Sequence, residues 1–272
     1  MDKRRLLIRL LPVGIAGLVI LFQFFSAEKV TNEAGRTARY ALSSREEKTL
    51  GLQSYDQILS ESETVDSGPD YELVSRVKQR LAAATGPSAK HFVWEVSLVR
   101  NPQVNAFCLP GGKIVVYTGI LPVAKTEAGL AAVMGHEMAH ATLRHGSERL
   151  FQKKATQTLM TGLQTSVGDL SYEQQRAVMG AIGAGARYGV LLPFSRDHES
   201  EADKIGLRYM ARAGYDPAEA IAFWQRMSHV AGSGGGKPPE FMSTHPSDTT
   251  RIAQLRQLLP QAQAEYQRAA QP

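Results

Sequence analysis

The sequence predicts a mostly helical α+β protein with a small antiparallel sheet and an N-terminal membrane helix. Three observations lead to this class: an uncharged apolar run at Leu10–Ala27, a β-type hydrophobic pattern between residues 92 and 118, and helical periodicity from there onward. The chain has 272 residues, of which 43% are hydrophobic and 21% are charged, and this is the composition of a globular protein.

The net charge of +5 lies mainly at the N-terminus, where only Asp2 offsets the positive charges of Lys3, Arg4, Arg5 and Arg9. The remaining chain is nearly neutral, so no nucleic-acid partner is expected, because such a partner requires a dense basic face. The single cysteine, Cys108, excludes a disulfide framework and every paired-thiol metal motif. A metal site in this chain must therefore use histidine and carboxylate ligands.

The apolar run follows a basic flank, which is typical of a segment inserted into a membrane. Residues 1–27 are either a retained signal anchor or a cleaved signal peptide. Phe25 lies where a small residue precedes a cleavage site, and this favours the anchor. In both cases the chain after Glu28 is expected on the non-cytoplasmic, periplasmic side, either membrane-anchored or, after cleavage, released.

Four regions are predicted: the N-terminal segment 1–27, a polar stalk or packing arm at 28–69, a main domain at 70–260 and a polar tail at 261–272. The main domain begins with a helix at Asp70–Ala84. Three strands are expected next, and the last two form a hairpin. The strand segments are 92–99, 105–109 and 113–118. The helices that follow are expected at 126–149, 150–166, 172–190, 195–213, 217–230 and 247–259, with a flexible loop at 232–239.

The first of these helices carries His136, Glu137 and His140 in a His-Glu-x-x-His pattern. Two residues four apart lie about 40° apart on one helix face, so both imidazoles can reach the same cation. Glu137 flanks that cation, where it can take a proton from water and pass it to a departing amine.

A catalytic zinc site needs a third protein ligand. His145 lies about 180° round the helix from His136, so it faces away unless the helix breaks. On the later helix, Glu199 and Asp203 share one face, whereas Glu201 points about 200° away from Glu199. We therefore expect Glu199 as the ligand and Asp203 as the acceptor that orients a ligating histidine. Glu201 and Asp197 are expected on a solvated charged face.

These residues belong to a longer series of motifs that together are highly specific. The motifs are Asn105-Ala106-Phe107 with Pro110-Gly111-Gly112, the His136–His140 pattern, Glu199 through Gly206, and Thr244-His245-Pro246 with Arg251. In this order they resemble the M48 zinc metallopeptidases, a gluzincin family that includes Oma1-like and bacterial periplasmic proteases. The resemblance implies a zincin-type core, one zinc ion per chain, and Glu199 rather than Glu201 as its third ligand.

The resemblance also implies a metalloendopeptidase that acts on unfolded, damaged or misassembled membrane and envelope proteins in protein quality control. The alternative is an anchored holdase that has the protease fold and little activity. By resemblance, His245 enters the active site, either as a fourth metal ligand or as a donor to the oxyanion. Arg251 either holds the oxyanion or braces the loop.

A peptide substrate is held most easily as an extended strand paired with a sheet edge. The predicted hairpin provides such an edge, and we assign Asn105, Ala106 and Phe107 to substrate binding, as the resemblance supports. Cys108 is expected to be a packed thiol rather than a ligand.

Overall fold

The computed structural model describes residues 3–168, 170–176, 180, 195–233, 239–245 and 249–271. The chain forms two compact units. The first unit contains residues 1–31, 37–43 and 147–192, and the second contains 32–36, 44–146 and 193–272. Each unit is described separately.

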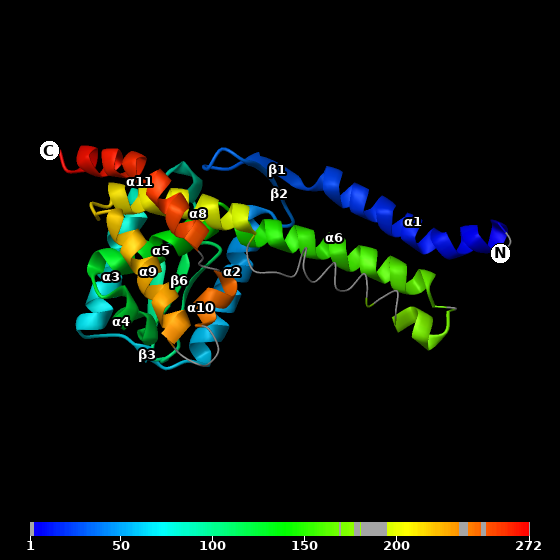
Figure 1. Cartoon of the computed structure of the whole chain (residues 1–272), viewed down its shortest axis with the longest axis horizontal. Coiled ribbons are helices and arrows are strands. Elements are labelled where there is room, and N and C mark those ends of the chain that lie inside the picture. The colour runs from blue at the N-terminus through cyan, green and yellow to red at the C-terminus, as the bar shows by residue number, and fades with distance from the viewer. Residues whose placement is uncertain are drawn as a thin grey trace. The chain divides into compact units, whose positions relative to one another are not determined.

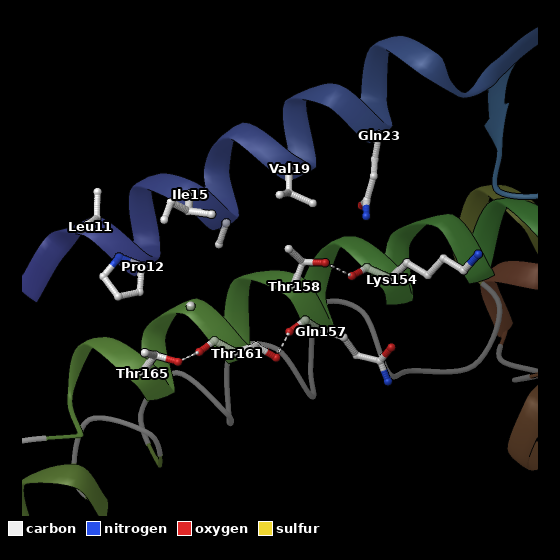
Figure 2. Close-up of a pocket in the computed structure, with 12 residues that line it drawn as sticks. Leu11, Pro12, Ile15, Val19, Gln23, Lys154, Gln157, Thr158, Thr161 and Thr165 are labelled. Atoms are coloured by element: carbon white, nitrogen blue, oxygen red, sulfur yellow. Dashed lines mark hydrogen bonds between the residues drawn. The ribbon is translucent and has the colours of Figure 1, made fainter.

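The first unit is built on two long helices, α1 (Lys3–Ser26) and α6 (His145–Ser166), and the small hairpin of β1 (Glu28–Thr31) and β2 (Thr37–Tyr40). The helices approach closely, because a Cβ atom on Gly162 would lie only 2.6 Å from the Cβ of Ala16. A groove between them is lined by apolar side chains of α1 and by threonines of α6 (Figure 2).

Helix α1 exposes large apolar side chains, with Leu18 at 67%, Phe22 at 73% and Phe25 at 75% exposure. Within the part of the chain that the structure describes, no helix has the length and hydropathy needed to cross a bilayer. The N-terminal membrane helix therefore stays a prediction.

The second unit contains a four-stranded sheet in the order β3-β4-β6-β5. Its strands are β3 (Thr64–Val65), β4 (Glu95–Val99), β5 (Ala106–Leu109) and β6 (Lys113–Tyr117). Strands β5 and β6 form the predicted antiparallel hairpin, but β4 pairs with β6 in parallel. The expectation of a wholly antiparallel sheet was wrong. Strand β5 lies between β4 and β6 in the chain and runs antiparallel to β6, so β6 runs in the same direction as β4 and pairs with it in parallel.

Helices surround this sheet and form most of the second unit (Figure 1). They are α2 (Ser44–Ser60), α3 (Pro69–Ala84), α4 (Leu121–Ala124), α5 (Glu127–Thr142), α8 (Arg196–Arg212), α9 (Ala218–Ser233), α10 (Glu240–Thr244) and α11 (Thr249–Ala269), with short 3₁₀ turns at Pro87–Ala89 and Thr118–Ile120. The mostly helical α+β class is confirmed.

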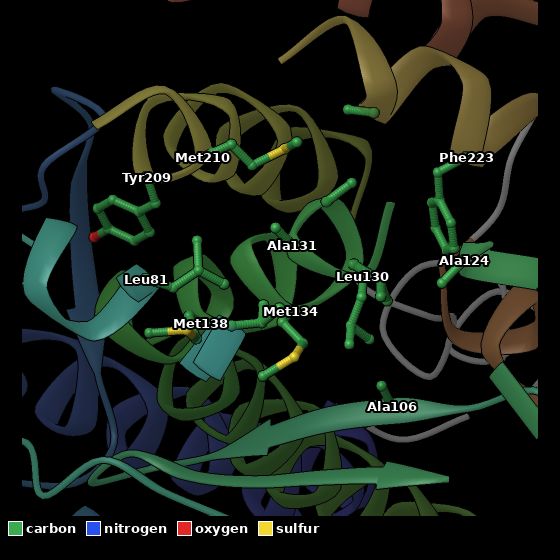
Figure 3. Packing of buried hydrophobic residues seen from close by; sticks show 14 of the residues in the cluster. Leu81, Ala106, Ala124, Leu130, Ala131, Met134, Met138, Tyr209, Met210 and Phe223 are labelled. Carbon is green, nitrogen blue, oxygen red and sulfur yellow. The ribbon is translucent and has the colours of Figure 1, made fainter. Parts of the chain in front are cut away.

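Helix α5 lies at the centre of the core, and all its residues from Gly129 to Thr142 are buried. Figure 3 shows Met134 and Met138 of α5 beside Leu81 of α3. The close approach of α5 to α8 depends on Gly206, where a Cβ atom would lie 3.0 Å from the backbone of His136. The small residues of these helices therefore bring two backbones together at the point where the candidate ligands begin.

The predicted helix at 126–149 is divided in the structure. Helix α5 ends at Thr142, Arg144 takes a positive φ of 59°, and α6 begins at His145. A positive φ at a residue other than glycine interrupts a right-handed helix, and no sequence signal here predicts it.

The last helix also differs from its predicted end before Pro260. Helix α11 contains Pro260 and continues to Ala269, so residues predicted as a polar tail are helical. Tertiary contacts explain this extension, because Ala262 is buried and Glu265 forms ion pairs with Arg208 and Arg212 of α8. The predicted helix at 172–190 and the loop at 232–239 lie largely outside the described residues.

Candidate metal centre

The centre begins with the two histidines of α5. His136 and His140 are both buried, and their Nε2 atoms lie 3.0 Å apart. One turn of helix separates them, which is the arrangement that their spacing predicts.

Helix α8 brings Glu199 to the same point. Its Oε2 lies 3.4 Å from Nε2 of His136, and its Oε1 lies 3.3 Å from Nε2 of His140. Ser195 caps this helix by accepting a hydrogen bond from the backbone N–H of His198, so Glu199 lies within the first helical turn.

His245, at the C-terminal end of α10, is the fourth member. Its Nδ1 lies 3.0 Å from Oε1 of Glu199 and 3.3 Å from Nε2 of His136. Its ring stacks on Phe241 with the ring centroids 4.7 Å apart. The resemblance had indicated an active-site position for His245, and the structure brings it into the group.

These four side chains fit a zinc ion. A tetrahedral zinc site with bonds of about 2.0–2.1 Å places its donor atoms about 3.3 Å from one another. The five donor–donor distances given above range from 3.0 to 3.4 Å. The donor set of three imidazoles and one carboxylate is also a set that zinc accepts, and all four residues are buried.

Asp203 and Arg251 pack directly against the ligands. Asp203 Oδ1 lies 2.9 Å from Nδ1 of His136, the nitrogen that faces away from the group. Arg251 donates from Nε to Asp203 Oδ2 at 2.9 Å and from Nη1 to Glu199 Oε2 at 2.9 Å. The guanidinium carbon of Arg251 lies 3.3 Å from the ring centroid of Trp224. Arg251 therefore pairs with two carboxylates of α8, and its two predicted roles, holding the oxyanion or bracing the loop, stay predictions.

The electrostatics favour an ionised Glu199. Burial alone would raise the pKa of Glu199, but hydrogen bonds from His136, His140 and His245 lower it strongly. Burial and the charge of Arg251 lower the pKa of His136, but hydrogen bonds to Asp203 and Glu199 outweigh them and raise it to about 9. Burial lowers the pKa of His140. The carboxylate thus holds its charge where a cation would bind.

Glu137 lies beside the group on α5. It is buried, and its Oε1 accepts no hydrogen bond from the described residues, although His245 Nε2 lies 3.4 Å away. Burial raises the pKa of Glu137 above its usual value. A carboxylate with a raised pKa is a better general base at neutral pH.

The predicted substrate-binding residues lie on or next to β5. This strand is at the edge of the sheet, because β6 is its only partner among the described strands. Asn105 precedes it and accepts a hydrogen bond from the backbone N–H of Tyr117 at 3.1 Å. Burial, and then the charge of Glu137, raise the pKa of Cys108 on this strand. The strand therefore lies near Glu137, and Cys108 is not in the metal-binding group.

Two residues that the sequence analysis did not assign to the site, His145 and Glu201, lie on the side of His140 that faces away from the donor atoms. His145 is fully buried, and its Nδ1 lies 2.9 Å from Nδ1 of His140. Glu201 pairs with His145 and with Arg36, so its expected place on a solvated face was wrong. Burial would raise the pKa of Glu201, but hydrogen bonds from His145, Arg36 and Asn32 lower it to about 2. Asp197 is exposed, as expected.

An α+β core in which α5 provides two histidines, α8 a glutamate and the end of α10 a third histidine, all beside a second buried glutamate, defines a zinc metallopeptidase site. The comparison with known families identifies this class more closely. The chain matches Peptidase family M48 over residues 70–259, and it belongs to that family. The cofactor of the family is zinc, and the group described above could hold such an ion.

The similar curated proteins are named as metalloendopeptidases or proteases. The chain is 40% identical over 222 residues to the mitochondrial metalloendopeptidase OMA1 of Schizosaccharomyces pombe, covering 80% of this chain and 63% of that protein. It is 32% identical to the protein of the same name from Saccharomyces cerevisiae, covering 82% and 66%. It is 28% identical to the beta-barrel assembly-enhancing protease of Escherichia coli, covering 82% and 46%. The chain thus spans less than two thirds of the length of each of these relatives.

Proposed function

We propose that this protein is a zinc-dependent endopeptidase. The observation that carries the proposal is the buried carboxylate of Glu137 beside a four-donor metal group. Bound zinc would polarise the scissile carbonyl and lower the pKa of a water molecule. Glu137 would take the proton of that water and hand it to the departing amine, and the raised pKa of Glu137 suits both transfers.

Each surrounding residue has a defined part in this proposal. His136, His140 and Glu199 hold the metal, and Asp203 orients His136 through its Nδ1. Arg251 neutralises the two carboxylates and keeps them in place.

His245 defines a closed resting state. Its Nδ1 takes the fourth corner of the donor group, where a water molecule would otherwise bind, and its Nε2 faces Glu137. For cleavage to occur, His245 must leave this corner. Because it lies at the end of the five-residue helix α10, only a short segment has to move.

The substrates are proposed to be unfolded or misassembled proteins of a membrane or cell envelope. Pairing of a substrate strand with the free edge of β5, at Asn105, Ala106 and Phe107, would use backbone hydrogen bonds. Backbone pairing recognises an extended conformation rather than a sequence, so folded proteins would be excluded. The name of the Escherichia coli relative, a beta-barrel assembly-enhancing protease, supports a substrate of this class.

We also propose that α1 holds the protein at a membrane, with the catalytic domain on the periplasmic side. The exposed Leu18, Phe22 and Phe25 support this placement, because lipid would cover apolar side chains that water does not solvate well. The protein should remain in the membrane pellet after carbonate extraction. Mass spectrometry of the purified N-terminus should find the residues of α1, whereas a chain that starts near Glu28 would indicate cleavage.

The function is tested with the variant Glu137→Gln. It should bind zinc as the wild type does and lose cleavage of an unfolded casein substrate, since an amide cannot accept the proton. Chelation of the wild type should abolish cleavage, and added zinc should restore it.

The matched control is Glu127→Gln, because Glu127 lies at the start of the same helix and binds Arg76 and Tyr215 instead. It should cleave at the wild-type rate. Normal cleavage by Glu137→Gln would contradict the assigned base. A zinc-bound wild type that binds unfolded substrate without cleaving it would support the holdase alternative.

A further inference from the structure

A line of hydrogen bonds leads away from the metal group, from His140 through His145 to Glu201. The ring nitrogen of His140 that faces away from the donor group, Nδ1, lies 2.9 Å from Nδ1 of His145. The opposite nitrogen of His145, Nε2, lies 3.1 Å from Oε2 of Glu201. The His145 ring stacks on His198 with centroids 4.3 Å apart and an interplanar angle of 22°, which holds the ring in its plane.

The line ends in a tight turn formed by residues 32–36. Asn32 donates to Oε2 of Glu201 at 2.9 Å, and the guanidinium of Arg36 forms an ion pair with the same carboxylate. The turn is closed by a bond from the backbone N–H of Arg36 to Oδ1 of Asn32 at 3.0 Å, and by Gly35, which has a φ of 94°. Lys204 of α8 donates to the carbonyl of Ala34 at 3.2 Å, so the turn is attached to the helix that carries Glu201.

The order of donors and acceptors along this line can be assigned from chemistry. A carboxylate paired with arginine only accepts hydrogen bonds, so Nε2 of His145 must donate to Glu201. A His140 that keeps its Nε2 lone pair for a metal carries its proton on Nδ1, so Nδ1 of His140 donates to the Nδ1 lone pair of a neutral His145. The one lone pair left on the His140 ring is at Nε2, the atom that lies 3.3 Å from Glu199 and 3.0 Å from Nε2 of His136.

We propose that His145 and Glu201 are positioning residues that fix the tautomer and ring orientation of His140, so that its Nε2 always faces the metal. A carboxylate then orients each of the two metal-binding histidines of α5. His136 donates directly to the carboxylate of Asp203, whereas His140 reaches the carboxylate of Glu201 through one intervening imidazole. This inference deepens the proposed function, because it concerns the same zinc site.

Metal binding itself provides the test, using the full-length protein. Zinc affinity is measured by competition with a chromophoric chelator, and the geometry is followed in the visible absorption of the cobalt-substituted protein. Glu201→Gln removes the negative charge that fixes which atoms donate and which accept along this line of hydrogen bonds. His145→Phe removes both ring nitrogens while keeping a ring to stack on His198. We expect each variant to bind zinc about 10–100-fold more weakly than the wild type and to change the cobalt spectrum.

Asp197→Asn is the matched control, because Asp197 is an exposed carboxylate on the same helix, four residues before Glu201. It also loses one negative charge near the metal, so it measures the effect of charge alone. Its zinc affinity should stay within about threefold of the wild type, since exposed charges are strongly screened. Circular dichroism of each zinc-free variant checks that the fold is retained.

The inference is overturned if Glu201→Gln retains the fold and matches Asp197→Asn in both zinc affinity and cobalt spectrum. If His145→Phe does not fold, Glu201→Gln alone decides the outcome. These readouts are independent of peptide cleavage. Failure of the endopeptidase proposal would appear as an inactive wild type with normal metal binding, and failure of the positioning proposal would appear as variants with normal metal binding.

Discussion

Replacement of Arg251 by methionine tests what holds the metal ligands in place. Methionine has a similar length and can still pack on Trp224, but it leaves Glu199 and Asp203 without their buried cation. Removing one partner of a buried ion pair costs about 3–5 kcal/mol. We expect the lower end of this range in the zinc-free protein, because His136, with its pKa of about 9, stays positively charged beside both carboxylates at pH 7.

Urea unfolding of the zinc-free protein in mild detergent measures this loss. Both tryptophans, Trp94 and Trp224, lie in the second unit, so their fluorescence reports on the unit that contains the metal centre. With a denaturant dependence of about 2–3 kcal/mol per molar urea, a loss of about 3 kcal/mol lowers the midpoint by about 1–1.5 M. Arg256→Met, an exposed change on the same helix, should stay within about 0.5 kcal/mol of the wild type.

Equal midpoints for Arg251→Met and Arg256→Met would refute the bracing role. If Arg251→Met also lost cleavage while it kept wild-type stability and zinc content, Arg251 would instead act on the developing oxyanion, the other role that its position in the sequence allows.

Three further outcomes follow from the geometry. His245→Ala should release zinc to a chelator about 10-fold faster than the wild type and cleave unfolded casein faster, because the fourth ligand position of the metal becomes open. Slower cleavage with unchanged zinc release would mean that His245 stabilises the oxyanion. Gly206→Ala should lower the free energy of unfolding by about 1–3 kcal/mol, since its new Cβ would lie 3.0 Å from the His136 backbone. Gly146→Ala is the control, because no atom lies within 4 Å of its new Cβ, and it should be neutral or stabilising by up to about 1 kcal/mol. Thermal unfolding compares the two variants. The pKa of Glu201 is lowered from 4.5 to about 2, so its contribution is complete above pH 4.5 and is lost as the pH falls toward 2. The zinc-free wild type should therefore exceed Glu201→Gln by about 1–2 kcal/mol at pH 6, after allowance for solvent screening, and this difference should shrink at pH 3; a difference that does not change with pH would contradict the assigned ion pairs.

Local helical geometry explains why much of the metal centre could be predicted. The spacing of His136 and His140, and of Glu199 and Asp203, places each pair on one face of its own helix regardless of what packs around it. Small residues such as Gly206 also predict that the two helices approach closely. These features depend on residues close together in the chain, so the sequence alone contains them.

Other features depend on contacts between residues far apart in the chain, and only the tertiary structure decides them. The break after Thr142, where Arg144 pairs with Glu47 97 positions earlier, turns His145 back toward His140, although a continuous helix would have pointed it away. Glu201 is part of the site because Arg36 and Asn32, more than 160 positions earlier, reach it. Helix α11 passes Pro260 because Glu265 is held by arginines of α8. In each case a long-range contact outweighs the weaker local preference on which a prediction from sequence depends.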